Sequence, residues 1–163
     1  MTALVAPPFT LQPGDVQLFR GSGLMGFIVR QKTWSDVGHV EVYMGDGLAA
    51  TARSDGVRLF PVRDDHCYVY RPVASFNREA ALIRFKAEAD GQGYDWLGLV
   101  SAFIARRAGH RNKMFCSECV TRVLRWGGVD VFEAGCDADS VSPAQFKQTP
   151  ALRRVWCREG GCK

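Results

Sequence analysis

Cys116 stands where the segment KMFCSECVTRVLRWGG changes from a loop to a run that is apolar at helical spacing. A cysteine reacts as its thiolate, and the positive end of a helix dipole lowers the pKa of a thiol placed there. A nucleophilic thiol also needs a base, and the candidates are His39, His66 and His110. Cys116 is therefore a reactive thiol, one half of a metal-binding or redox pair with Cys119, or a small buried hydrophobe.

The three histidines differ in their expected surroundings. His39 begins a predicted strand directly after Gly38, where a side chain at a sheet edge can point toward a helix packed on the sheet. His66 lies in the charged loop RDDHC and His110 in the break AGHRNK, and loop histidines are usually solvated. We select His39 as the candidate base, with a purely structural role in the strand as the alternative.

The C-x-x-C spacing of Cys116 and Cys119 is also used by zinc sites and by thiol-exchange proteins. A structural zinc site needs two further ligands, and the close pair Cys157 and Cys162 has a poor spacing for one. A redox motif is expected after a strand of a parallel sheet, whereas this one follows a helix and a basic loop. We expect no metal and no cofactor, and zinc or redox chemistry is the less favoured interpretation.

Hydrophobic periodicity predicts the elements that position these residues. A short strand is predicted in 14–21 and a short helix in 24–33. From 37 to 71 the period changes to two, which predicts a meander of about four strands with a hairpin turn at the GDG of 45–47. In the first of these strands the alternation places Glu41 on the same face as His39.

The helical period returns after Pro72. The pattern predicts three longer helices at 77–89, 94–109 and 116–128, and the first of them is capped by Asn77 and places Ala80, Ile83 and Ala87 on one stripe. A brief helix is predicted at 140–148, with Ser142 as its cap and Pro143 at its first position. A final strand is predicted around Val155 and Trp156. The predicted fold class is therefore α+β, with an antiparallel sheet or half-barrel packed against helices.

Length and composition predict one soluble domain over 1–163, with an irregular lead-in at 1–13 and a tail at 157–163. The net charge of +4 is modest and its basic residues are scattered, which argues against a nucleic-acid partner. The N-terminal segment has no leader pattern, and no stretch is apolar over a membrane-spanning length. We expect a cytoplasmic protein, or a phage-associated one released on lysis, with reduced thiols except for a pair of Cys157 and Cys162 under oxidising conditions.

Five segments in order resemble the circularly permuted papain-fold hydrolases: PGDVQLFRG, GHVEVYMGDG, GQGYD, FCSECV and SVSPAQF. This family includes YiiX/YebB-like proteins and is related to NlpC-type cell-wall peptidases and to lecithin retinol acyltransferase. In the permuted group the histidine precedes the cysteine, and here His39 precedes Cys116 by 77 residues. The resemblance implies a permuted papain-like fold over most of the chain.

The resemblance also implies roles for single residues. Cys116 matches the nucleophile, His39 the general base, and Tyr94 in GYD the tyrosine that helps to hold the oxyanion. A backbone N–H at the start of the Cys116 helix is the expected second donor. Glu118 recurs in the permuted group and is expected to line the pocket, unless it is a first-turn glutamate favoured by the helix dipole.

The residue that orients the histidine is less well matched. Relatives carry a polar residue about 12 positions past the base, and this register falls on Thr51. A threonine hydroxyl can accept a hydrogen bond from imidazole but stabilises an imidazolium less than a carboxylate does. Glu41 is the alternative, unless it is a solvent-facing charge on the strand. A Cys–His dyad, or a lost activity, is also consistent with the sequence.

These observations predict a thiol hydrolase of the cysteine peptidase or amidase type. The resemblance implies amide bonds of cell-wall peptides (muropeptides), or acyl bonds of lipids, as the substrate. The alternative is a non-catalytic module that keeps the fold and binds a peptide or a lipid. The oligomeric state is left open.

Overall fold

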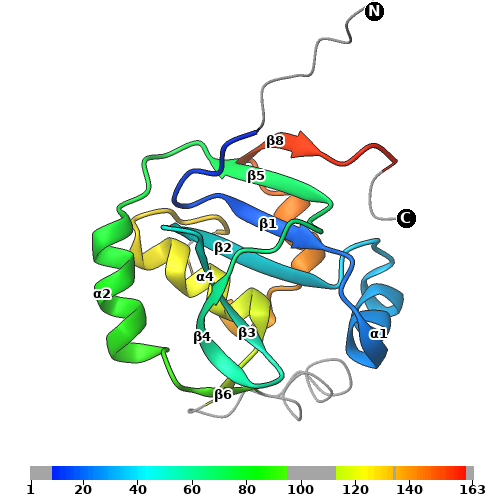
Figure 1. The fold of residues 1–163 in the computed structure, drawn as a ribbon, viewed down its shortest axis with the longest axis horizontal. Coiled ribbons are helices and arrows are strands. Elements are labelled where there is room, and N and C mark those ends of the chain that lie inside the picture. Colours follow the sequence, from blue (N-terminus) through cyan, green and yellow to red (C-terminus); the bar gives the residue numbers. More distant parts are fainter. Residues whose placement is uncertain (1–8, 95–112, 134, 161–163) are drawn as a thin grey trace, which may run out of the picture.

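A six-stranded antiparallel sheet forms the centre of the molecule (Figure 1). The structure is a computed structural model that describes residues 9–94, 113–133 and 135–160. The strands lie in the order β4-β3-β2-β1-β5-β8, and a short parallel pair joins β6 to β7. Their bounds are β1 Val16–Phe19, β2 His39–Gly45, β3 Leu48–Arg53, β4 Gly56–Pro61, β5 Tyr68–Pro72, β6 Gly93–Tyr94, β7 Lys113–Met114 and β8 Leu152–Cys157.

Helices complete the α+β fold that the sequence predicted. In the described residues they are α1 Gly23–Thr33, α2 Arg78–Glu88 and α4 Cys116–Trp126, with the short 3-10 helices η1 Ala138–Ser140 and η2 Pro143–Lys147. The predicted brief helix with Pro143 at its first position is the second of these 3-10 helices. Most of the helix predicted at 94–109, and His110, lie outside the described residues.

The hairpin between β2 and β3 fixes the register of the site. Asp46 and Gly47 form its two-residue turn, and both have left-handed backbone, with φ of 55° and 72°. Positive φ at both central positions is the geometry of a tight hairpin turn, which suits the Asp-Gly pair. As a result, Val42 lies opposite Ala50, and the residues around His39 lie beside those at the end of β3.

The sheet order corrects the predicted four-stranded meander. Strands β2, β3 and β4 do follow one another, but β5 pairs with β1 and β8 instead of β4. The strand that begins at Val16 is inserted between β2 and β5. Period-two alternation identifies a strand and its buried face, but it does not specify a partner that is distant in sequence.

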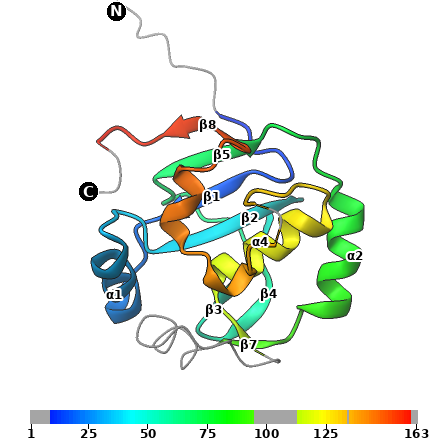
Figure 2. The same cartoon turned by 180° about the vertical axis from the view of Figure 1, so that it is seen from behind.

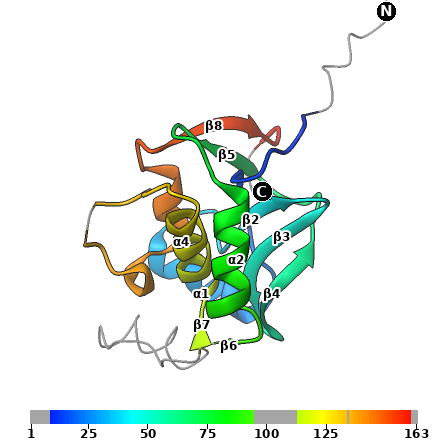
Figure 3. The same cartoon turned by 90° about the vertical axis from the view of Figure 1, so that its left-hand side faces the viewer.

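Helices α2 and α4 pack against each other, and α4 crosses β2 and β3 (Figures 2 and 3). Asn77 caps α2, because its side chain accepts the Ala80 N–H at 3.0 Å. The buried residues of α2 are Ala81 and Phe85, whereas Ile83 is exposed. The predicted stripe on α2 was therefore shifted by about two positions, because which side of a short helix is buried depends on the sheet and helix that it meets.

The cysteines also differ from the expectation of reduced thiols with a pair between Cys157 and Cys162. Cys67 is disulfide-bonded. Cys157 is an exposed free thiol at the end of β8, where it lies opposite Tyr68. The β5–β8 ladder holds Cys157 in extended backbone, and Cys162 lies outside the described residues. Among the described residues, every helix is too short or too polar to cross a membrane.

Candidate active site

Cys116 is the first residue of α4. Phe115 precedes it in extended conformation as the N-cap and provides no side-chain hydrogen bond to the helix. The first N–H groups of a helix have no acceptor within the helix, and the dipole makes this end positive. The sulfur of Cys116 therefore lies where a thiolate is stabilised, although its residue is only 6 % exposed.

His39 begins β2 and contacts both Cys116 and Glu41. A side-chain hydrogen bond joins its imidazole to Cys116. Its Nε2 lies 2.9 Å from Glu41 Oε1 and donates to this carboxylate. Because Nε2 faces Glu41, Nδ1 is the ring nitrogen left for the sulfur. The structure therefore brings together a thiol, an imidazole and a carboxylate in the order that nucleophilic catalysis requires.

The electrostatic environment of His39 favours an imidazolium. Burial by itself lowers the pKa of the ring. The charge of Cys116 and its hydrogen bond, followed by the hydrogen bond and charge of Glu41, outweigh burial and raise the pKa of His39 from 6.5 to about 9. At neutral pH the imidazole of His39 is therefore protonated and lies beside the ionised carboxylate of Glu41.

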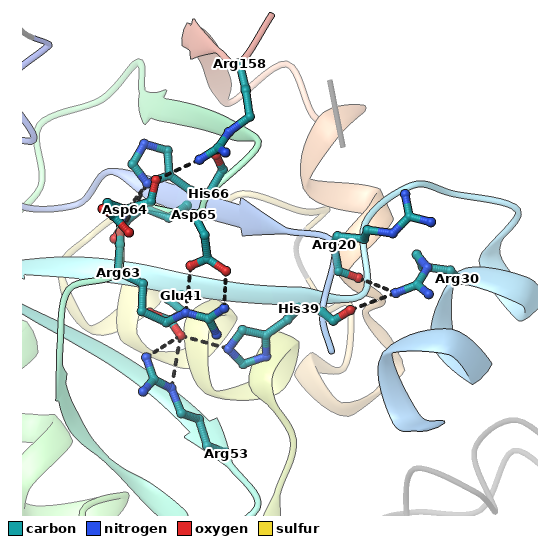
Figure 4. A network of polar contacts seen from close by, with 12 residues as sticks. Arg20, Arg30, His39, Glu41, Arg53, Arg63, Asp64, Asp65, His66 and Arg158 are labelled. Atoms are coloured by element: carbon teal, nitrogen blue, oxygen red, sulfur yellow. Dashed lines mark hydrogen bonds and ion pairs between the residues drawn. The ribbon is translucent and has the colours of Figure 1, made fainter. Parts of the chain in front are cut away.

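Glu41 is fully buried and still ionised. Burial raises the pKa of its carboxyl, but the hydrogen bond and charge of His39, together with Arg53, outweigh it and lower the pKa below its ordinary value. Arg53 Nη2 lies 2.7 Å from Glu41 Oε1. Figure 4 shows His39 and Arg53 pointing toward this one carboxylate. Glu41 is not the solvent-facing strand charge that the sequence left as an alternative.

Thr51 does not orient the imidazole. Its hydroxyl is fully buried and donates to the Val40 carbonyl at 2.8 Å, and within the described residues no hydrogen bond joins it to His39. The prediction for Thr51 is corrected because the ring N–H that an orienting residue would accept, at His39 Nε2, donates to Glu41 instead. The contact that the resemblance placed 12 positions past the base is made by Glu41, two residues along the same strand.

Two other predicted site residues are placed only in part. The backbone of Tyr94 pairs with Met114, two residues before Cys116, and the side chain of Tyr94 lies outside what the structure describes. Glu118 is buried in the first turn of α4 and binds Arg122 Nη2 at 2.7 Å. Its place in the first turn fits the alternative that the sequence left open beside a pocket role, a glutamate favoured by the helix dipole, and the ion pair with Arg122 is a further structural contact.

Sequence reasoning missed two neighbours of the site. Arg53 ends β3, and period-two alternation from Thr51 would have placed it on the face that carries His39. Phe19 of β1 lies opposite His39, with the two ring centroids 5.9 Å apart. Arginine and phenylalanine are not residue types that indicate catalysis in a sequence, so only the register between the strands shows that these two lie beside His39.

The Cys116–Cys119 pair does not have the features of a redox or zinc site. Cys119 is fully buried, and burial, together with the charges of Cys116 and Glu118, raises the pKa of its thiol. Within the described residues, no three His, Cys, Asp or Glu side chains gather in a way that would hold a metal ion. Cys119 is therefore a core thiol one helical turn below the candidate nucleophile.

Comparison with known proteins supports the fold. No family model and no curated protein matches the sequence. Among solved structures, the metalloprotein YiiX of Escherichia coli O157:H7 is similar, with a TM-score of 0.67 over 90 % of this chain and 97 % of that one. The chain has the fold of YiiX. At 17 % identity the likeness extends to the fold only, and the described residues of this chain do not provide a metal-binding set.

Replacing Cys116 with serine is expected to lower the pKa of His39 from about 9, because the interaction with Cys116 is the largest of the influences that raise it. Burial, which lowers the pKa of His39, would then be opposed mainly by Glu41. An NMR titration of the histidine ring measures this change. Cys157→Ser, at an exposed free thiol, is the matched control, and an equal shift in both variants would contradict the His39–Cys116 contact.

Proposed function

We propose that this protein is a thiol hydrolase or acyltransferase in which Cys116 is the nucleophile and His39 the general acid and base. The observation that carries this proposal is the connected series Cys116, His39 and Glu41 at the N-terminus of α4. Nucleophile, base and orienting carboxylate in hydrogen-bond contact form the arrangement on which acyl transfer by a thiol depends.

In the proposed reaction, the Cys116 thiolate attacks the carbonyl carbon of an amide or ester. The carbonyl oxygen becomes an oxyanion, and N–H groups of the first turn of α4 stabilise it. The His39 imidazolium gives its proton to the leaving amine or alcohol, and the C–N or C–O bond breaks to leave an acyl-enzyme.

Neutral His39 then takes a proton from water or from an acceptor alcohol or amine, which attacks the acyl-enzyme and releases Cys116 as a thiolate. Glu41 stabilises the imidazolium in both halves of the reaction. Because a carboxylate favours an imidazolium more strongly than a neutral side chain does, Glu41 is well suited to this role.

Amide bonds of cell-wall-type peptides are the proposed substrates, with acyl esters of lipids as the second class. Support comes from the order of motifs that resembles the permuted papain-fold hydrolases, which are related to NlpC-type peptidases, and from the YiiX-like fold. A mass spectrum of the protein quenched during incubation with muropeptides or with an activated ester such as p-nitrophenyl acetate tests this assignment. An acyl adduct on Cys116 is expected, and Cys116→Ala should give no adduct and no turnover.

Alkylation with iodoacetamide is the first test, because it needs no substrate. At mildly acidic pH, Cys116 should react about ten-fold or more faster than Cys136 and Cys157, since ordinary thiols are protonated there. The two comparison cysteines are free and more accessible than Cys116, so accessibility favours the opposite order. Faster labelling of Cys157 would indicate a binding module instead of an enzyme.

A further inference from the structure

The carboxylate of Glu41 is bound unevenly. Among the described residues, its Oε1 accepts hydrogen bonds from His39 Nε2 at 2.9 Å, from Arg53 Nη2 at 2.7 Å and from Arg53 Nε at 3.1 Å. The other oxygen, Oε2, is buried and has no hydrogen-bond partner in that part of the chain. The same oxygen, Oε1, therefore accepts hydrogen bonds from the imidazole of His39 and from two N–H groups of the Arg53 guanidinium (Figure 4).

Arg53 is held in place independently of Glu41. It is the last residue of β3, and its backbone pairs with Gly56 across the turn to β4. Its guanidinium carbon lies 4.2 Å from the ring centroid of Phe60, and its side chain is 25 % exposed. A guanidinium stacked on an aromatic ring keeps a fixed plane, so its fork of donors is preorganised.

We propose that Arg53 is a positioning residue for the Cys116–His39 centre: by binding Oε1 of Glu41 with two donors, it holds the buried carboxylate ionised and aimed at His39 Nε2. Arg53 acts through Glu41 and has no contact with the reacting sulfur in this arrangement. The effect of Arg53 on catalysis rests on the proposed function. The binding of Glu41 by Arg53 can be tested independently of that function.

The charges around Glu41 explain why this hold matters. His39 on its own strand and Arg53 from β3 bind it, while Arg63 from the segment after β4 and the Cys119 thiol from α4 interact with it electrostatically. Burial penalises the carboxylate, and two cations bind it directly: the imidazolium of His39, which takes part in the proposed reaction, and the guanidinium of Arg53, which keeps its charge throughout. Without Arg53, Glu41 would take up a proton at higher pH and would then no longer stabilise the His39 imidazolium.

Arg58 provides a matched control. Its guanidinium carbon lies 5.8 Å from the same Phe60 ring, and its Nη2 donates to the Asp55 carbonyl at 2.7 Å. Within the described residues, no hydrogen bond or ion pair joins Arg58 to Glu41. Replacing Arg58 therefore removes an arginine from the same strand pair and the same aromatic ring, but leaves the carboxylate bound.

The experiment compares Arg53→Met, Arg53→Lys and Arg58→Met with the native protein. A carbon-13 NMR titration of the Glu41 carboxyl should show its midpoint rising by about one pH unit or more in Arg53→Met. Alkylation of Cys116 by iodoacetamide should fall about ten-fold at mildly acidic pH in the same variant, because a charged hydrogen bond is lost. Arg53→Lys keeps a cation, so its Glu41 midpoint and its Cys116 alkylation rate should lie between those of the native protein and of Arg53→Met. Arg58→Met should match the native protein in both measurements.

An unchanged Glu41 midpoint in Arg53→Met, or an equal rise in Arg58→Met, overturns the inference. If Arg53→Met does not fold, the Arg53→Lys titration decides the question, since its smaller upward shift is still expected. The carboxyl titration is independent of hydrolysis. A native protein in which Cys116 reacts no faster than Cys157 would therefore reject the proposed function, while the Glu41 midpoints would still decide the role of Arg53.

Discussion

Replacing His39 with asparagine should slow acylation of Cys116 by p-nitrophenyl acetate about 10²- to 10⁴-fold, the usual contribution of a general acid–base group. The substitution removes the imidazolium that stabilises the thiolate and the group that carries the proton to the leaving alcohol. It also leaves Glu41 and Arg53 to pair with each other, so the buried carboxylate keeps one charged partner. Release of p-nitrophenol in stopped flow, with the acyl adduct confirmed by mass spectrometry, measures the effect.

His66 is the control for this substitution. Its ring packs on the same Phe19, with centroids 6.2 Å apart, and on Trp156 at 4.8 Å. It is a half-buried histidine whose pKa is lowered, first of all by burial, and within the described residues its ring hydrogen bonds are to Gln17 and to the Arg63 carbonyl, not to Cys116, His39 or Glu41. His66→Asn should therefore leave acylation within about two-fold of the native rate, since only a group in contact with the reacting atoms contributes such a factor. Equal losses in the two variants would mean that folding, and not proton transfer, explains the His39 result.

Replacing Asp15 with alanine should destabilise the fold by about 3 kcal/mol, the cost of breaking a buried ion pair. Asp15 is fully buried before β1, and Arg71 of β5 binds it through Nε and Nη2, each at 2.7 Å. The carboxylate also accepts the Gln12 N–H at 2.8 Å. Removal of the carboxylate leaves the Arg71 guanidinium without its ion-pair partner and only partly exposed to water. It also removes the side-chain contact between the segment that enters β1 and the neighbouring strand β5. Thermal unfolding should show a fall in Tm of about 6–12 °C.

The comparison for Asp15 is the surface pair of Arg84 and Glu88 on α2. Both side chains are exposed, and exposed ion pairs contribute about 0–1 kcal/mol. Glu88→Ala should therefore move the Tm by no more than about 3 °C. A fall in Asp15→Ala as small as this would show that burial of the pair does not matter to stability.

Local patterns predicted most elements of the sheet. The alternation from His39 to Met44 identified β2, the Asp-Gly pair identified its hairpin, and Asn77 identified the start of α2. These signals are local because steric limits at Gly, a side-chain cap and a period of two act over a few residues. The pairing of β5 with β1 and β8 was not predicted, since it depends on burial shared between segments that are distant in sequence.

The sequence by itself identified the two groups proposed to react in the candidate site: a cysteine at a helix start and a histidine at a strand start, in the order that the resemblance to permuted papain-fold hydrolases implies. The tertiary structure decided their partners. Thr51 satisfies a neighbouring backbone carbonyl, while Glu41, held by Arg53 from the next strand, meets the imidazole. A residue type and its spacing show what a side chain can do, but a buried carboxylate becomes useful only where packing brings cations to it, and that depends on the register between strands.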